Sequence, residues 1–252
     1  MRYSAGLHTS KKHNILKYRW RSALVSWIWI IATLLVLSFL VNISSLDLGQ
    51  MFGGFLLSLI RTTVAYLIAA FCAIVIALSI TSSKTIENIF LPVFDVLQSF
   101  PSFALFPVLV VALQNSPETV IISVLTITMI WPILFSIIGG IKNRRQDFEE
   151  AATIFGARGW KRLVYFTFPE LMPSIITGSI VGWGEGWEFI IGAELLVKAH
   201  IGIGSYLGVL GENQQNLSLA FGIVILLLLL YIINRLIWLP LLSKATSYSS
   251  EA

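Results

Sequence analysis

Two carboxylates, Glu185 and Glu188, stand three residues apart inside a long apolar run of the sequence. Residues at this spacing share one face of an α-helix, so both carboxylates would project to the same side. Ionisable groups at membrane depth are usually partnered or functional, because an uncompensated charge in hydrocarbon is costly. Trp183 and Trp187 lie beside the pair among several glycines, which permit close approach, and the indole rings offer flat apolar walls. This stretch is therefore a candidate wall of a solute pathway.

Two further charges, Arg61 and Glu194, also lie inside apolar runs. At a rise of about 1.5 Å per residue, Arg61, Glu188 and Glu194 all fall within about 12 Å of the same end of their predicted helices. We expect Glu188 or Glu194 to be the partner of Arg61. For Arg61 and Glu194, the alternative to a place in the pathway is a structural ion pair, or side chains that reach out to the membrane interface.

No pattern of catalysis or metal binding accompanies these charges. His8, His13 and His200 have no second ligand at metal-site spacing. Outside the apolar runs the sequence has no glycine-rich phosphate loop, nucleophile elbow or paired catalytic carboxylates. The single cysteine, Cys72, precludes an intrachain disulfide. We therefore expect no enzyme activity, no metal site and no cofactor bound by this chain itself.

The composition is that of an integral membrane protein. Of the 252 residues, 56% are hydrophobic and only 12% are charged, and the mean hydropathy is +0.84. Several apolar runs are long enough to cross a hydrocarbon core about 30 Å thick. The net charge of +4 does not indicate a nucleic-acid partner, because the basic residues stand beside the apolar runs. The sequence thus predicts an all-α integral membrane fold in a lipid bilayer.

Six apolar runs predict six transmembrane helices in a single membrane domain, residues 23–241. The predicted spans are 23–41, 55–81, 93–113, 120–141, 174–197 and 217–239. The first run is long for a signal-peptide core and lacks a cleavage site, so we expect it to be retained. The third run contains Pro92, Pro101 and Pro107, so we expect either two broken pieces beside a cavity or an ordinary kinked helix.

Six spans place the tails, residues 1–22 and 242–252, on the same side as the loop 142–173. Fourteen of the seventeen Lys and Arg residues fall in the segments assigned to that side. Cytoplasmic segments carry the excess of positive charge in membrane proteins. We therefore expect both tails and this loop in the cytoplasm, with the chain in a bacterial-type plasma (inner) membrane.

The loop 142–173 has the pattern of a short amphipathic helix. A variant capping box ends at Glu150, and Gly156 stands where helices commonly finish in a left-handed residue. A second helical turn follows, which we expect Pro169 and Pro173 to interrupt. From the residues alone, the segment fits a helix on the membrane surface as well as a surface that meets a soluble partner.

The same loop carries a spaced motif. Glu150, Ala151 and Ala152 are followed after three residues by Gly156 and, after nine more, by Phe166-x-Phe168-Pro169. This spacing resembles the EAA loop of ATP-binding-cassette importer permeases, E-A-A-x3-G-x9-I-x-L-P, with phenylalanine at both aliphatic positions. A wider similarity to the permeases of nitrate, sulfonate and taurine importers covers most of the chain. Its residues include Ser58, Arg61, Pro92, Gln98, Pro101, Trp187, Glu194, Gly202 and Gly204.

The resemblance implies a type I importer permease fold in which this loop is a coupling helix. The coupling residues would be Glu150, Ala151, Ala152, Gly156 and Pro169. It further implies separate cytoplasmic ATPase subunits that bind the ATP, an extracytoplasmic solute-binding protein, and a homodimer of this chain. The alternative is a secondary transporter or a membrane receptor that needs no ATPase, which would have no use for the motif.

Glu185 and Glu188 also bear on the solute. Ionised carboxylates would repel an anion unless burial keeps them protonated, so a neutral or cationic solute fits better. The resemblance implies that the separate binding protein sets most of the specificity, so the sequence does not name the solute.

Overall fold

The computed structural model describes residues 46–113, 116–143 and 154–250. The predicted tail 1–22 and first span 23–41 lie outside these residues. Every regular element within the described ranges is a helix or a helical turn. They are α2 (Leu48–Ile80), α3 (Lys84–Gln98), the 3-10 turn η1 (Ser102–Leu105), α4 (Phe106–Ala112), α5 (Pro117–Lys142), α7 (Gly159–Arg162), the π-helical turn η2 (Leu163–Thr167), α8 (Phe168–Leu196), α9 (Ile203–Glu212), α10 (Asn216–Ile233), the π-helical turn η3 (Asn234–Trp238) and α11 (Leu239–Ser250).

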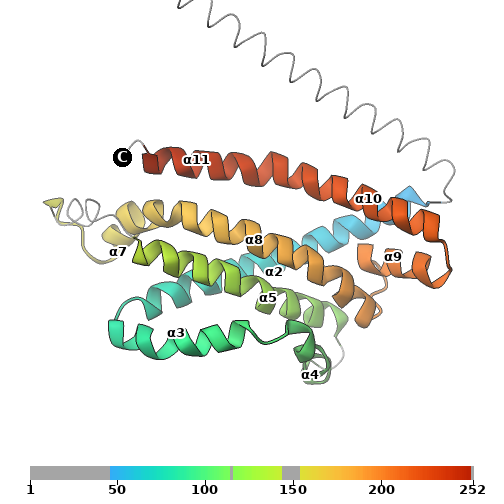
Figure 1. Ribbon diagram of the computed structural model, residues 1–252, viewed down its shortest axis with the longest axis horizontal. Coiled ribbons are helices and arrows are strands. Elements are labelled where there is room, and N and C mark those ends of the chain that lie inside the picture. Colours follow the sequence, from blue (N-terminus) through green and yellow to red (C-terminus); the bar gives the residue numbers. More distant parts are fainter. Residues whose placement is uncertain (1–45, 114–115, 144–153, 251–252) are drawn as a thin grey trace, which may run out of the picture.

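The long helices run side by side in one bundle (Figure 1). α2, α5 and α8 occupy the middle, α10 and α11 run along one side, and α3 with α4 lies along the other. α7 and α9 lie at opposite ends of the bundle, which we call the α7 end and the α9 end. Successive long helices alternate in direction, so α11 finishes at the same end as α7.

The centre of the bundle is packed through small residues. Gly178, Gly182 and Gly186 form a row on α8, four residues apart, that faces α5. A Cβ added to Gly186 would lie 1.8 Å from Met129 Cε, and one on Gly178 would lie 2.8 Å from Ile133 Cα. Since lipid offers no hydrophobic force between apolar helices, close van der Waals packing across small residues is what holds them together. Gly178 is therefore needed for this contact, because a Cβ there would meet backbone atoms of α5, whereas the flexible end of Met129 could move away from a Cβ at position 186.

The expected fold class is confirmed. Four helices are long and apolar enough to cross a membrane, Leu48–Ile80, Pro117–Lys142, Gly159–Leu196 and Asn216–Ala245, and a bent pair makes a fifth if it counts as one span. These helices overlap the second, fourth, fifth and sixth predicted spans.

The third predicted span, 93–113, is two pieces. α3 begins at Lys84, well before the predicted start, and the chain bends by 84° between Gln98 and Ser102. Pro101 explains the place of the break, because the residue before a proline disfavours the helical conformation. Aromatic contacts hold both pieces to the bundle: Phe94 lies 6.0 Å from Trp131, and Phe103 stacks on Phe189 at 4.4 Å between ring centroids.

Two other boundaries differ from the prediction. Pro169 and Pro173 do not interrupt the helix, because α7, η2 and α8 form one continuous helix from Gly159 to Leu196. Pro169 stands at the start of α8, and the wider turn η2 directly before it makes room for the proline ring within the helix. The predicted C-terminal tail, residues 242–252, is helical as far as Ser250, where α11 ends.

Candidate functional site

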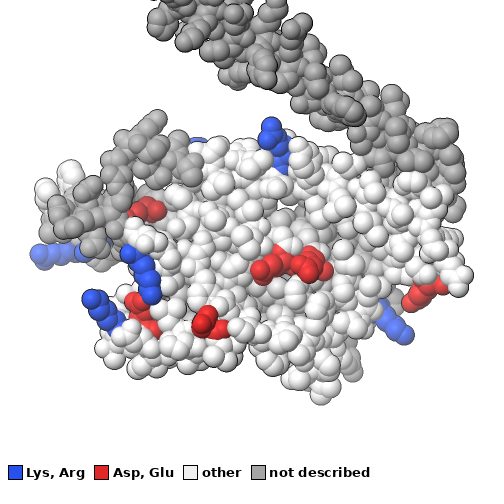
Figure 2. All heavy atoms as spheres, viewed as in Figure 1, with Lys and Arg blue, Asp and Glu red and all other residues white. Residues whose placement is uncertain are grey.

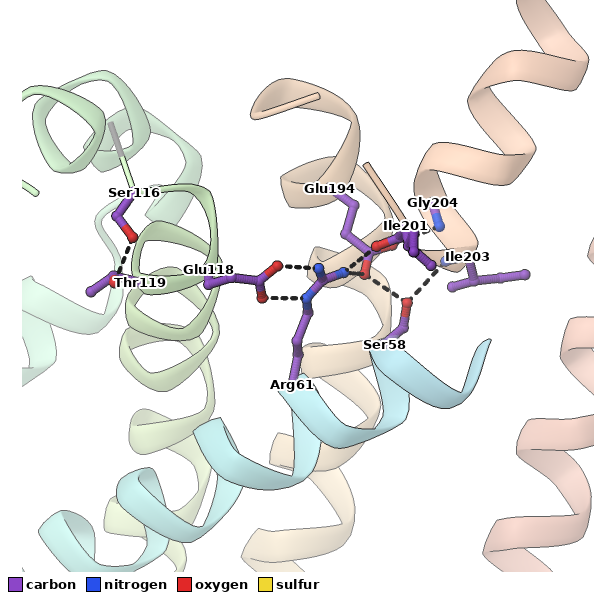
Figure 3. A network of polar contacts seen from close by, with 9 residues as sticks. All are labelled: Ser58, Arg61, Ser116, Glu118, Thr119, Glu194, Ile201, Ile203 and Gly204. Carbon is purple, nitrogen blue, oxygen red and sulfur yellow. Dashed lines mark hydrogen bonds and ion pairs between the residues drawn. The ribbon is translucent and has the colours of Figure 1, made fainter. Parts of the chain in front are cut away.

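Arg61 and Glu194 meet at the α9 end in a network that we call the arginine clasp (Figure 3). Arg61 Nη1 donates to Glu194 Oε1 at 2.8 Å and to the carbonyl oxygen of Ile201 at 2.7 Å. Arg61 Nε donates to Glu118 Oε2 at 2.7 Å, and Nη2 pairs with the other oxygen of the same carboxylate. One guanidinium thus joins α2, α5, α8 and the connection just before α9.

The buried carboxylate of the clasp has all its partners. Glu194 is 0% exposed, and it accepts hydrogen bonds from Ser58 Oγ at 2.6 Å and from the Gly204 amide at 2.8 Å, besides that from Arg61. Ser58 Oγ in turn accepts a bond from the Ile203 amide at 2.9 Å. A buried ion pair is tolerated only when such bonds satisfy its remaining lone pairs. The clasp therefore fixes the start of α9 through its backbone.

Glycines make room for this arrangement. A Cβ on Gly202 would lie 2.4 Å from Glu194 Cδ, and one on Gly54 would lie 2.8 Å from the carbonyl carbon of Gly202. A Cβ on Gly204 would lie 2.5 Å from the carbonyl oxygen of Ile191. The glycine pair noted in the sequence is thus required for the close approach of the α8–α9 connection to α2 and α8.

Of the two partners expected for Arg61, Glu194 is the one found, while Glu188 lies outside the clasp. The sequence analysis missed Glu118, which is the first acidic residue of α5. It considered only charges inside the predicted spans, and Glu118 stands just before the fourth. Glu118 lies at the same end of the bundle as Arg61, so a search that included the loop ends could have found it.

Of the six candidate pathway residues, four pack inside the bundle and two reach its surface. Trp187 and Glu194 are buried, with Trp187 stacked on Phe55 at 5.3 Å, and Arg61 is also inside. Half-buried Trp183 belongs to an aromatic cluster with Tyr66 and Trp238. The other two, Glu185 and Glu188, reach the surface.

Glu188 belongs to an exposed stripe on α8, opposite the glycine row. The stripe consists of Thr177, Val181, Gly184 and Glu188, and half-buried Glu185 flanks it. Figure 2 shows acidic atoms over α8 in the middle of a broad face that carries few other charges. A carboxylate at this depth is poorly suited to lipid, so the stripe needs water or protein beside it.

The predicted coupling residues lie at the α7 end. Glu150, Ala151 and Ala152 are outside the described residues. Gly156 has φ of +64°, the left-handed conformation expected for it, and nothing lies within 4 Å of an added Cβ.

Aromatic and basic residues stand close to Gly156 in the sequence. Phe155 and Trp160 are exposed, and Phe155 lies 6.4 Å from Phe166, between ring centroids. Arg158 and Lys161 are close to them in the chain, and Lys161 is exposed. The described part of the loop therefore presents aromatic and basic groups at one end of the bundle.

Among the residues that the structure describes, no three His, Cys, Asp or Glu side chains lie close enough together to hold a metal ion.

The family model of the binding-protein-dependent transport system inner membrane component matches residues 69–238. The chain belongs to this family. The match runs from within α2 to the end of η3, so it contains the loop between α5 and α8, the stripe on α8 and both carboxylates of the clasp, Glu118 and Glu194.

Curated relatives agree with the family model. The chain is 31% identical over 180 residues to the nitrate import permease protein NrtB of Synechocystis, an alignment that covers 71% of this chain and 63% of the relative. It is 29% identical over 171 residues to the bicarbonate transport system permease protein CmpB of Synechococcus elongatus (68% and 60%). It is 26% identical over 177 residues to the taurine transport system permease protein TauC of Escherichia coli (70% and 64%).

The resemblance to the nitrate, sulfonate and taurine branch is thereby confirmed. The chain spans less than two thirds of the length of each of these relatives.

Proposed function

We propose that this chain is the membrane-spanning permease subunit of an ATP-driven, binding-protein-dependent importer. The observation that carries the proposal is the family match across α5, the following loop and α8, together with the spaced motif inside that loop. The motif begins in the loop after α5 and ends inside the helix Gly159–Leu196, so it links two helices that are long enough to span a membrane. A secondary transporter or a membrane receptor would give no reason for it.

The α7 end is the proposed docking site for a separate ATPase subunit, which binds the ATP. Exposed Phe155 and Trp160 supply apolar contact area, while Lys161 supplies charge. Because α7 continues through η2 into α8 as one helix, a displacement of the docked segment is transmitted directly to a membrane-spanning helix.

The α7 end faces the cytoplasm in this proposal. Most of the basic residues in the described ranges belong to that end, namely Lys84, Lys142, Arg158, Lys161, Arg162 and Lys244. At the α9 end, Arg61 is buried in the clasp and Lys198 stands in the loop before α9. This asymmetry is the one that the positive-inside rule associates with a cytoplasmic face. The α9 end would then meet the extracytoplasmic solute-binding protein.

The stripe on α8 is the proposed lining of the solute pathway, formed where a second copy of the chain faces the first. Two copies would shield Glu185 and Glu188 from lipid and enclose water between them. The named solutes of the relatives include nitrate and bicarbonate. Two carboxylates would repel such anions, so we propose a solute that is neutral or cationic at the group that passes α8.

A gentle detergent pull-down of the tagged chain from its own cells tests this function. Wild type is compared with Gly156→Asp and with the matched control Gly159→Asp. Both glycines have positive φ, +64° and +53°, with nothing within 4 Å of an added Cβ, so both substitutions add the same bulk and charge in a similar backbone conformation. Only Gly156 belongs to the motif.

We expect an ATPase subunit and a solute-binding protein to co-purify with wild type and with Gly159→Asp. The ATPase should be lost from Gly156→Asp at equal amounts of protein. If no ATPase accompanies the wild-type chain under several mild conditions, the importer proposal fails and the loop is better interpreted as a helix on the membrane surface.

A further inference from the structure

Two π-helical turns occur in the described helices, and each stands directly before an X-Pro pair. In η2 the Phe168 amide donates to the carbonyl oxygen of Leu163, five residues back, and Pro169 follows. In η3 the Leu239 amide donates to the carbonyl oxygen of Asn234, and Pro240 follows. A π turn holds one residue more than the α-helix around it, so each turn contains one surplus residue.

Proline alone does not produce such a turn in this chain. Pro92, Pro132 and Pro173 stand inside α-helices that contain no π turn. Pro169 cannot donate to the carbonyl of Tyr165, and in a regular helix its ring would collide with that carbonyl. A wider turn relieves the collision, provided that a surplus residue is available. The surplus residue and the proline together therefore explain η2.

The described residues leave open space beside α7. Gly156 and Gly159 have open space around them. An open hollow of about 360 Å³ separates α7 and η2 from the ends of α2 and α5, where Leu78 and Ile141 lie opposite Leu163. This hollow leaves room for a rotation of α7 about the axis of α8. By contrast, η3 is anchored, because Trp238 is buried against Tyr66 and Trp183.

We propose that Pro169 is a positioning residue, which together with the surplus residue of η2 sets the direction in which α7 and the loop before it leave α8. If η2 relaxed to a regular helix of the same length, α7 would rotate by about 100° relative to α8 and shift along its axis by about 1.5 Å. The motif would then face away from its docking partner. This consequence rests on the proposed function, whereas the direction of α7 does not.

Three variants separate the effect of Pro169 from that of the surplus residue in η2. Pro169→Ala restores the missing amide donor and permits the relaxation. Pro169→Ala combined with deletion of Tyr165, the most exposed residue of η2, also removes the surplus residue, so the regular helix returns α7 to its original direction. Pro240→Ala makes the same change at the anchored turn η3 and is the matched control.

The direction of α7 is measured by the distance between two spin labels on the chain in detergent. The labels replace exposed Lys84 and Lys161 by cysteine in a Cys72→Ser background. A side chain about 5 Å from the helix axis moves by roughly 5 Å or more in a rotation of this size. We expect Pro169→Ala to shift the distance, and the deletion variant and Pro240→Ala to reproduce that of wild type. An unshifted Pro169→Ala, or a deletion variant that does not return to the wild-type distance, overturns the proposal.

Solute-stimulated ATP hydrolysis by the purified complex adds a functional readout. Coupling effects in proteins commonly amount to about 5- to 150-fold, so we expect roughly tenfold slower stimulated hydrolysis for Pro169→Ala and recovery in the deletion variant. If stimulated hydrolysis is unchanged although the label distance has shifted, the positioning role in coupling is excluded. If no ATPase associates even with wild type, the proposed function fails, while the label distances still decide the direction of α7.

Discussion

Arg61 is bound by two carboxylates whose surroundings differ. Glu194 is completely buried, whereas the side chain of Glu118 is 57% exposed. The loss of one partner from a buried ion pair costs several kcal/mol, because the other charge stays buried and unpaired. An exposed partner contributes much less, because water and salt screen it. The two halves of the clasp should therefore differ in their effect on stability.

Arg61→Met is expected to destabilise the chain by about 3 kcal/mol or more, since it leaves Glu194 without its cation. Glu118→Gln is expected to cost about 1 kcal/mol or less. Thermal unfolding of both variants in the same detergent measures the difference. If both variants lose the same amount of stability, the charge of Glu194 is neutralised without Arg61. The buried ion pair between Arg61 and Glu194 would then not be the main contribution of the clasp to stability.

Glu188 is exposed on α8, and it is expected to act on the solute rather than on the fold. Glu188→Gln should lower solute-stimulated ATP hydrolysis by roughly fivefold, because it removes a charge from the proposed pathway. The amount of bound ATPase should stay the same. Asp95→Asn, on the exposed surface of α3, is the control and should change neither quantity. A parallel loss of ATPase binding and hydrolysis in Glu188→Gln would indicate misfolding instead of a role in the pathway.

At the scale of elements, the contact between α2 and α9 depends on one glycine of a neighbouring pair. A Cβ on Gly54 would lie 2.8 Å from backbone atoms of Gly202, while nothing lies within 4 Å of a Cβ on Gly53. Gly54→Ala should therefore lower the melting temperature, since neither backbone can yield easily. Gly53→Ala should be neutral or stabilise by about 0.5–1 kcal/mol, because alanine favours the helix. A similar effect of both changes would contradict the observed approach of α9.

The sequence was sufficient to predict the long helices because their apolar residues are nearly continuous. It did not predict α9, although Ile203, Leu207 and Leu210 form an apolar stripe, because this helix of 10 residues is much shorter than the apolar runs on which the prediction rests. It also did not predict the π turns, since hydropathy has no signal for one surplus residue. Hydrogen-bond geometry within the helix decides such turns.

The candidate site was likewise predictable from the sequence only in part. Pairing of Arg61 with Glu188 or Glu194 could be predicted, because buried charges near one end of a bundle have a strong reason to meet, but the choice of Glu194 could not. The backbone donors of Ile203 and Gly204 could not, because they depend on how closely the glycines let the chain approach. The buried position of Trp187 depends on Phe55 of another helix, which spacing along one helix does not reveal.

At the scale of the whole molecule, the two ends of the bundle have different constructions. The α9 end is closed by the clasp, whose buried hydrogen bonds join four parts of the chain. The α7 end is open, with a hollow beneath α7, two glycines of positive φ and exposed aromatic rings. A firmly held end and an adjustable end are what a permease needs if a partner at one end is to move helices that remain assembled at the other.

The central claim is that the α7 end contacts an ATPase subunit, and photocrosslinking in intact cells tests it most directly. A photoreactive phenylalanine derivative replaces Phe155, which is 78% exposed. In the control it replaces Tyr231 of α10, which is 61% exposed and is not part of the loop or of α7. We predict that position 155 forms an adduct with a soluble ATPase and that position 231 does not. If position 155 yields no ATPase adduct while the chain is present at its normal level, the docking of an ATPase at this end is contradicted.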